Sequence, residues 1–428
     1  MRILLTGATG FIGQHLLSAL LLAGHQVTIC CRKPEKIIQQ SPNISIHQIN
    51  FEAITNPEDW QPFLQSIDAV INCVGIIKET DSGSFEVLHH LVPCALFRAC
   101  ARMSIKKVVQ ISALGAELDA STDYFISKAK ADKLLRTLDI NWYIFKPSVI
   151  FGHGAKSMAL FRALAALPIT PILADGQQLL QPVALADLQQ AVLLALDPNT
   201  PSQQMIAAVG PEPMTFVSLL QDLAQQLGRK LKPWPIPQVW FKVLLPLFGC
   251  LDEPILNKQS LTMLQQGNRA EPKQFADFLG HHPHSLTQFL HTTPSSQAER
   301  WHARLYFLRP LLNLSIALVW LWTGWISAFV YPVADSFQML SRVGISGWLA
   351  PWVLYSAALA DFLLGIALLF RWRLRLTVAL QIGIMLAYSV VITVYLPEFW
   401  LHPFGPLIKN LPFFIATLIL LILEEEQP

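Results

Sequence analysis

A tyrosine and a lysine four residues apart, Tyr124 and Lys128, are suited to proton transfer. Side chains at this spacing share one face of a helix, so both can reach one ligand. A nearby ammonium group stabilises tyrosinate, so we expect Lys128 to lower the pKa of Tyr124 toward neutrality. Tyr124 can then donate a proton to a carbonyl oxygen as a hydride arrives at the carbon. Ser112, twelve residues earlier, is expected to hold that oxygen.

Residues 7–13, with the sequence GATGFIG, have the spacing of a phosphate-binding turn. They follow a short apolar run typical of a strand and open an apolar segment, 11–23, with helical spacing. This context indicates a dinucleotide-binding fingerprint, and a glycine turn without a ligand is the alternative. Gly7 permits the tight turn, Gly10 lets the backbone approach a pyrophosphate, and Gly13 lets the helix pack closely on the strand. The helix then directs its free N–H groups at the phosphates.

Strand and helix signals alternate through residues 1–290 and predict an α/β fold with a doubly wound parallel sheet of the Rossmann type. A small substrate subdomain is expected within the same domain, with helices near 158–167, 185–196 and 215–227. The predicted strands are Arg2–Thr6, Val27–Cys31, Ile44–Ile49, Ala69–Cys73, Lys107–Ser112 and Trp142–Lys146.

The end of the second predicted strand indicates which nicotinamide nucleotide is preferred. NAD-binding proteins place a carboxylate there to accept from the ribose hydroxyl groups. Here the chain reads Cys30-Cys31-Arg32-Lys33, with no carboxylate before Glu35. Guanidinium and ammonium groups suit a 2′-phosphate, so NADP is favoured over NAD, and an ordinary basic loop is the alternative.

Residues 1–290 resemble an extended or atypical short-chain dehydrogenase/reductase. The likeness rests on the glycine motif, on Asn72-Cys73-Val74-Gly75, on Tyr-x-x-x-Lys at 124–128 and on the segments 146–152 and 181–187. Within that superfamily the chain is similar to the NAD(P)H-binding accessory subunit of respiratory complex I. Such relatives are thought to bind nucleotide without turnover, so a non-catalytic structural or assembly role is an alternative to catalysis.

The resemblance implies that Ser112, Tyr124 and Lys128 are the catalytic residues. Asn50 stands where the family often has an aspartate against the adenine, and its amide oxygen can still accept a hydrogen bond. The implied cofactor-binding residues are Gly7, Thr9, Gly10, Phe11, Ile12, Gly13, Arg32, Lys33, Asn50, Val74, Gly75, Tyr124, Lys128 and Pro147.

Charge and metal-ligand spacing argue against other functional classes. A formal net charge of +2 gives no reason to expect nucleic-acid binding. The six cysteines have no paired metal-ligand spacing and indicate reduced, buried thiols. The histidines at 281, 282, 284 and 291 have no cysteine or carboxylate spaced with them, so we predict loop histidines and no metal.

A polar linker rich in proline and serine is predicted at 291–304, and the chain changes character after it. The region 305–428 resembles the DoxX-like family of four-helix membrane domains, through Val319–Gly324 and Gly405–Pro412. Its apolar segments have no polar stripe, which favours a lipid bilayer over a soluble bundle. The four predicted spans are 311–330, 348–370, 376–396 and 406–423.

Basic residues predict the orientation of these spans. Arg300, Arg304 and Arg309 precede the first span, and three arginines fill the turn between the second and third, at 371, 373 and 375. The alternate loops offer only Arg342 and Lys409. The positive-inside rule therefore places the nucleotide domain and the C-terminus in the cytoplasm, with a bacterial inner membrane as the expected location.

Asp361 lies in the middle of the second predicted span, where a charge costs several kcal/mol. We weigh a proton or quinone site against a packing hydrogen bond. The sequence as a whole predicts a membrane-anchored oxidoreductase that prefers NADP and acts on an apolar small molecule, lipid or quinone. A quinone-linked membrane redox partner is a third hypothesis, since the DoxX-like resemblance implies a loose link to quinone chemistry.

Overall fold

The computed structural model describes residues 1–37, 41–80, 83–237 and 257–425. The chain divides into two compact units, Met1–Arg304 and Leu305–Pro428. The apolar run at 239–248 is too short to span a bilayer, and its sequence predicts a core helix, with a cover for the substrate site or a contact with the membrane surface as the alternatives. This run lies outside the described residues.

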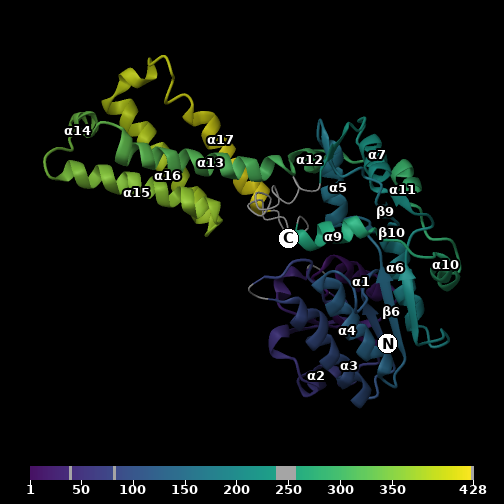
Figure 1. The fold of residues 1–428 in the computed structure, drawn as a ribbon. Coiled ribbons are helices and arrows are strands. Elements are labelled where there is room, and N and C mark those ends of the chain that lie inside the picture. Colours follow the sequence, from purple (N-terminus) through teal and green to yellow (C-terminus); the bar gives the residue numbers. More distant parts are fainter. Residues whose placement is uncertain (38–40, 81–82, 238–256, 426–428) are drawn as a thin grey trace. The chain divides into compact units, whose positions relative to one another are not determined.

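A seven-stranded parallel sheet forms the centre of the first unit (Figure 1). Its order is β11-β6-β5-β4-β1-β2-β3, so the direction of winding reverses between β1 and β4. The strands are β1 (Arg2–Thr6), β2 (Gln26–Cys31), β3 (Ile44–Gln48), β4 (Ala69–Asn72), β5 (Lys107–Ile111), β6 (Trp142–Pro147) and β11 (Gln204–Ala208). The six predicted strands are confirmed to within one residue, and β11 is a seventh that the sequence analysis missed.

Helices cover both faces of the sheet, which confirms the doubly wound arrangement (Figure 1). Alternate strand residues serve the two faces: Ile3 and Leu5 pack into one core, and Leu4 packs into the other. One face is covered by α1 (Phe11–Leu22), α6 (Leu185–Leu196) and α10 (Lys273–Leu279), and the other by α2 (Pro57–Leu64), α3 (Val92–Arg102) and α4 (Asp123–Thr137).

A smaller subdomain extends from the sheet and has its own apolar core. The predicted helices near 158–167, 185–196 and 215–227 are confirmed as α5, α6 and α7. The subdomain elements are β7 (Ile150–Phe151), α5 (Lys156–Ala166), β8 (Thr170–Leu173), β9 (Leu179–Leu180), β10 (Val183–Ala184), β12 (Met214–Thr215), α7 (Phe216–Gln226), β13 (Pro233–Ile236), α9 (Lys258–Gln266) and α11 (Leu286–Thr292).

The segment 291–304 differs from the predicted linker. It contains the end of α11 and most of α12 (Gln297–Leu305), and Ala303 is buried in the subdomain core. Ser295 Oγ donates to the Gln226 carbonyl oxygen at 2.8 Å. The turns of this segment are amphipathic. Their polar residues, which predicted a linker, lie on the exposed side, and their apolar side packs on the subdomain of the first unit.

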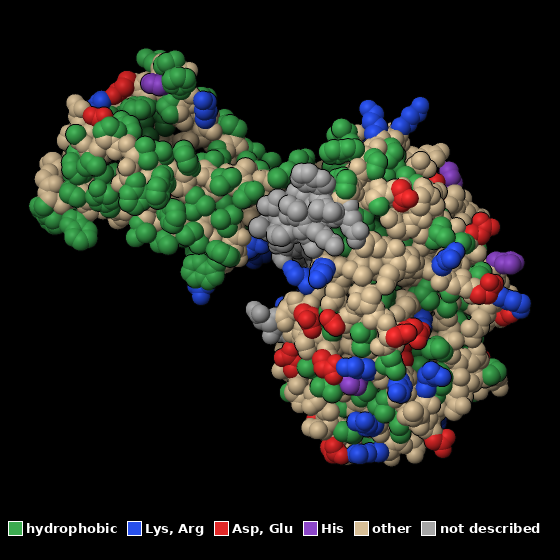
Figure 2. Space-filling view, viewed as in Figure 1, with side chains coloured by type: hydrophobic (Ala, Val, Ile, Leu, Met, Phe, Trp, Pro, Cys, Tyr) green, Lys and Arg blue, Asp and Glu red, His purple; other side chains and the backbone are tan. Residues whose placement is uncertain are grey.

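Helices build the second unit, and its elements are α13 (Leu308–Trp325) with a π-helical continuation (Ile326–Val330), α14 (Val333–Arg342), α15 (Leu349–Leu369), α16 (Leu374–Tyr395) and α17 (Asn410–Glu425). Within the described ranges, three helical segments are long and apolar enough to cross a membrane: Leu308–Val330, Leu349–Leu369 and Leu374–Tyr395. Hydrophobic side chains cover most of the visible face of this unit, which is typical of a surface in contact with lipid (Figure 2).

The fourth predicted span is shorter than expected. Turns occupy the chain before α17, including Gly405 at φ +51°, so the helix has only 16 residues. It nevertheless runs between both ends of the bundle. Asn410 Nδ2 donates to Ser389 Oγ at 3.1 Å near the end of α16, whereas Glu424 Oε1 lies 3.2 Å from Arg309 Nε at the start of α13.

Candidate functional site

Three glycines shape the turn between β1 and α1. Gly7 has φ +75°, and a Cβ atom there would lie 2.6 Å from the Cys73 carbonyl group, so the β1 turn closely approaches the β4 turn. A Cβ atom on Gly13 would lie 2.1 Å from the Gly7 carbonyl oxygen. Both positions therefore require glycine, and the roles predicted for them agree with this geometry.

Gly10 differs from the other two glycines because the space beside it is open. It is exposed, and a Cβ atom there would meet only the Gly7 carbonyl oxygen, at 3.3 Å. Gly10 is also the N-cap of α1, whose first turn has neither an acidic residue nor a side-chain cap. The free N–H groups at this helix end fit a phosphate, so the residues present suit a dinucleotide.

A buried chain of hydrogen bonds joins the ends of β1, β4 and β5. Thr6 Oγ1 donates to Asn72 Oδ1 at 2.6 Å, and Asn72 Nδ2 donates to Gln110 Oε1 at 2.7 Å. The Val74 backbone N–H donates to the same Asn72 oxygen at 3.3 Å. The strands on both sides of the winding reversal are thus held in register where open α/β sheets bind ligands.

Tyr124 and Lys128 share one face of α4, as predicted, and point toward the same sheet edge. Lys128 Nζ lies 5.7 Å from the centroid of the Tyr124 ring and donates to the Ile111 carbonyl oxygen at 3.3 Å. A Cβ atom on Gly75 would lie 3.5 Å from that ammonium nitrogen. The structure therefore brings Tyr124, Lys128 and the β4 turn together.

The predicted lowering of the Tyr124 pKa is wrong. Burial raises the pKa of Tyr124 to about 12, because its ring packs against Phe85 and His89 with centroids 5.8 and 5.3 Å away. Burial also lowers the pKa of Lys128, and the Asp132 carboxyl partly opposes that change. The four-residue spacing does place the Lys128 ammonium over the Tyr124 ring. Burial nevertheless decides the direction of the pKa shift.

Asp132 is a buried residue of this site that the sequence analysis missed. Ser112 Oγ donates to Asp132 Oδ2 at 2.5 Å, so the serine hydroxyl is already committed as a donor. Burial raises the pKa of Asp132 to about 6, although the Ser112 hydrogen bond and the Lys128 ammonium favour its ionised form. The signal was present in the sequence, since Asp132 follows Lys128 by four residues and must share its helical face.

His89 is a second buried residue that was missed. The Ile76 backbone N–H donates to His89 Nε2 at 2.9 Å, and His89 Nδ1 lies 3.1 Å from Ser127 Oγ. Burial, with the nearby Lys128 ammonium, holds the pKa of His89 far below its usual range. The neutral ring therefore accepts at Nε2 and fixes the segment after β4 beside Tyr124.

The remaining predicted residues lie at the same carboxyl edge of the sheet. Arg32 and Lys33 are exposed immediately after β2, and Pro147 ends β6. Asn50 follows β3, where its side-chain oxygen accepts the Glu52 backbone N–H at 3.2 Å. Thr9, Phe11 and Ile12 belong to the turn and the first helical turn of α1.

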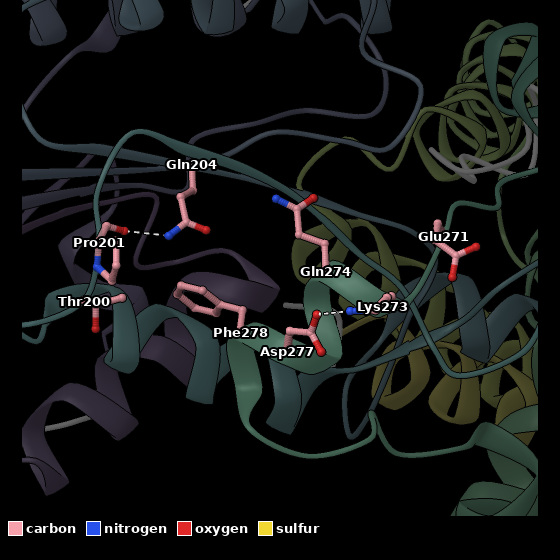
Figure 3. Close-up of a pocket in the computed structure, with 8 residues that line it drawn as sticks. All are labelled: Thr200, Pro201, Gln204, Glu271, Lys273, Gln274, Asp277 and Phe278. Atoms are coloured by element: carbon pink, nitrogen blue, oxygen red, sulfur yellow. Dashed lines mark hydrogen bonds and ion pairs between the residues drawn. The ribbon is translucent and has the colours of Figure 1, made fainter.

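A surface cavity of about 630 Å³ lies elsewhere, between α10 and the chain leading into β11 (Figure 3). Gln204 begins β11, so the cavity is at the amino edge of the parallel sheet, opposite the glycine turn. Its polar groups pair with one another: Gln204 donates to the Pro201 carbonyl oxygen, and Lys273 pairs with Asp277, both at 2.7 Å. We assign no part of the nucleotide site to it.

Comparisons with known proteins agree with this geometry. Residues 7–159 match the family described as NAD(P)H-binding, and residues 317–418 match the DoxX-like family. The chain is 25% identical over 249 residues to mitochondrial NADH dehydrogenase (ubiquinone) 1 alpha subcomplex subunit 9 of Mus musculus, which covers 57% of this chain and 66% of that protein. It is 24% identical over 238 residues to a ceramide reductase of Caulobacter vibrioides, with 53% and 70% covered.

A solved structure shows the same fold in the first unit. UDP-glucuronic acid 4-epimerase from Bacillus cereus, in complex with UDP-glucuronic acid and NAD, matches with a TM-score of 0.55 and 19% identity, covering 71% of this chain and 99% of that one. The first unit therefore has a Rossmann-type fold, and residues 7–159 within it match the NAD(P)H-binding family. The chain is thus similar in sequence to the NADH dehydrogenase subunit, its first unit shares its fold with the epimerase, and residues 317–418 match the DoxX-like family.

Gly10→Ala and Gly13→Ala should separate nucleotide binding from stability. Gly10→Ala is expected to weaken NAD(P)H binding at least tenfold with little change in stability, because its Cβ enters the open space where phosphates are expected. Gly13→Ala should destabilise the domain by roughly 1–3 kcal/mol or more, because its Cβ overlaps the turn backbone. Calorimetric titration and thermal unfolding measure the two effects. Gly383→Ala, whose Cβ meets nothing within 4 Å, is the control; unchanged nucleotide affinity in Gly10→Ala would contradict the assignment.

Asp132→Asn should remove a pH dependence of stability. Since the pKa of Asp132 rises from 3.8 to about 6 on folding, the folded state binds more protons than the unfolded state between these values. As the pH rises through this window, the free energy of unfolding of the wild type should therefore fall by up to roughly 3 kcal/mol relative to that of the variant, at about 1.4 kcal/mol per pKa unit. Denaturant unfolding across pH 4–7 measures the difference. Asp123→Asn, at an exposed position of α4, is the control, and parallel curves for wild type and Asp132→Asn contradict the prediction.

Proposed function

We propose that this chain is a membrane-anchored, NAD(P)H-dependent oxidoreductase that reduces a carbonyl group of an apolar or membrane-associated substrate. One observation carries the proposal. The open Gly10 turn and the Tyr124–Lys128 pair lie at the same carboxyl edge of one parallel sheet, next to the winding reversal. A nucleotide seated on the turn reaches the neighbourhood of these side chains in that architecture.

The residues suit the acid role in such a reduction. The turn at Gly10 would hold the nucleotide, whose nicotinamide would supply the hydride to the substrate carbon. Tyr124 retains its proton at neutral pH because burial raises its pKa, and it can donate that proton to the carbonyl oxygen. Lys128 supplies the positive charge nearest the ring, with its ammonium nitrogen 5.7 Å from the ring centroid. Asp132 accepts the Ser112 hydroxyl at 2.5 Å, and its negative charge favours the ammonium form of Lys128.

NADP is our proposed cofactor because of the charge at the end of β2. Arg32 and Lys33 are exposed there and lie at the sheet edge where the ribose end of a dinucleotide is expected. Their positive charge suits a 2′-phosphate, and no carboxylate precedes Glu35.

The helical unit supports a membrane anchor with the nucleotide domain in the cytoplasm. Glu424 Oε1 lies 3.2 Å from Arg309 Nε and 3.3 Å from Arg371 Nη2. The start of α13, the turn before α16 and the end of α17 therefore meet at one arginine-rich end of the bundle. The positive-inside rule places that end in the cytoplasm, in a bacterial inner membrane if the source is bacterial.

A nucleotide-binding structural role is the second candidate, and the state of Ser112 favours it. The serine hydroxyl donates to Asp132, so it must be released before it can donate to a substrate carbonyl. The mouse relative is a named subunit of NADH dehydrogenase, whereas the Caulobacter vibrioides relative is a named reductase. Retention of nucleotide without turnover distinguishes this candidate from the enzyme.

Tyr124→Phe should lower turnover by about 100-fold or more while leaving nucleotide affinity within about threefold, because only the acid hydroxyl is removed. NADPH oxidation by the full-length protein in detergent, with long-chain keto lipids and decylubiquinone as acceptors, measures turnover. Lys133→Met, at an exposed position of α4, is the control for Lys128→Met, which should also lose activity. Full turnover in Tyr124→Phe contradicts the mechanism, and tight nucleotide retention without wild-type turnover favours the structural role.

Arg32→Ala should weaken NADPH binding by roughly 10- to 100-fold, because a charge-assisted hydrogen bond to the 2′-phosphate is lost. NADH binding should stay within about threefold. Calorimetric titration with both nucleotides measures the ratio, with Lys36→Ala as an exposed basic control. A wild type that binds NADH more tightly, or an equal loss for both nucleotides, contradicts the preference for NADP.

A further inference from the structure

Polar side chains are buried inside the helical unit without hydrogen-bond partners. Within the described part of the chain, these include Trp320 Nε1, Asp361 Oδ1 and both amide atoms of Gln381. The three residues are 5%, 4% and 0% exposed. An unpaired polar group in an apolar interior costs several kcal/mol, so such groups require an occupant or a function.

Close helix contacts place Trp320 and Asp361 at the same depth. A Cβ atom on Gly324 would lie 2.7 Å from the Ala358 carbonyl oxygen, and one on Gly365 would lie 3.0 Å from the Ala317 carbonyl oxygen. Helices α13 and α15 are therefore antiparallel neighbours, paired at 324 with 358 and at 317 with 365. Trp320 and Asp361 both lie between these two contacts, and both belong to the buried sides of their helices.

Gln381 lies at that depth as well. Asp361 precedes the end of α15 at Leu369 by eight residues, and Gln381 follows the start of α16 at Leu374 by seven. At 1.5 Å per residue, each lies about 11–12 Å from the short turn that joins these antiparallel helices. Three helices thus contribute partnerless polar groups to one layer of the bundle.

The donors in this layer indicate what it can bind. The Trp320 indole offers one N–H group and the Gln381 amide offers two. Asp361 is the only acidic residue in α13, α15 and α16, so its carboxyl is most stable when neutral, with an O–H donor. A single carboxyl with so many donors does not suit a divalent cation, whereas it does suit an acceptor such as a carbonyl oxygen.

We infer that Trp320, Asp361 and Gln381 form a binding site for a neutral, lipid-soluble molecule that presents carbonyl oxygens, within the helical unit. The site belongs to the second unit and is independent of the nucleotide chemistry proposed for the first. Quinones and amide-linked lipids both carry this chemistry. The bundle supplies donors that lack protein acceptors, and the apolar outer surface of the unit suits a bilayer in which a lipid-soluble ligand dissolves.

Binding of two probes to the full-length protein in lipid nanodiscs tests the inference. Decylubiquinone and a short-chain ceramide represent the quinone and amide sources, and competition between them shows which is held. Trp320→Phe and Gln381→Leu should each raise the dissociation constant of the bound probe at least tenfold. Ser356→Ala is the matched control, because Ser356 is exposed on α15 and its hydroxyl donates to the Val353 carbonyl oxygen of its own helix.

Two further variants separate binding from packing. Asp361→Asn keeps a neutral donor and acceptor and should bind within about threefold of the wild type, whereas Asp361→Leu should lose binding. Gln381→Leu should not lower the melting temperature, because it removes an unpaired buried amide. Absence of saturable binding of both probes, or binding unchanged in Trp320→Phe and Gln381→Leu, overturns the inference. Loss of binding in Asp361→Asn overturns the neutral-carboxyl assignment on which the ligand class rests.

Discussion

The close approach of α1 to the turn after β1 is the constraint on which the site in the first unit depends. Gly13 leaves no room for a Cβ atom against the Gly7 carbonyl oxygen, and Gly7 leaves none against the β4 turn. These two contacts seat the helix N-terminus directly at the winding reversal of the sheet. Gly10 is then left with open space on its outer side, and the phosphate site proposed there depends on Gly7 and Gly13 having no side chains.

The parallel sheet brings the turn after β1 together with the other residues of the candidate site. All strands point the same way, so segments more than a hundred residues apart in sequence end at one edge. The hydrogen bonds from Thr6 through Asn72 to Gln110 fix the relative positions of three strand ends. Lys128 adds a contact from α4 to the end of β5. The polar groups of this edge therefore pair with one another through hydrogen bonds within the protein.

Local patterns in the sequence predicted much of this unit. Apolar runs bounded by turn residues gave six strands, and glycine spacing gave the turn, because both depend on neighbouring residues. The strand β11 was missed because QMIAA is short and only weakly β-branched. The Tyr124 pKa was wrong in direction because spacing reveals a neighbouring charge but not burial by Phe85 and His89. Likewise, the polar composition of 291–304 predicted a linker, because it does not reveal that the apolar side of this segment is buried in the subdomain core.

Both units bury some polar atoms without hydrogen-bond partners, but those of the helical unit lie on helices that are apolar on nearly every side. In the first unit, the buried polar groups near the carboxyl edge of the sheet have hydrogen-bond partners within the protein: Thr6, Asn72, Ser112 and His89. In the helical unit, the amide of Gln381 has none, although its helix is apolar on nearly every side. A leucine there would pack without an unpaired group, so packing alone does not account for a glutamine. The groups that a folded bundle leaves unpaired are the ones available to a ligand, and the glycine motif of the first unit gives no information about them.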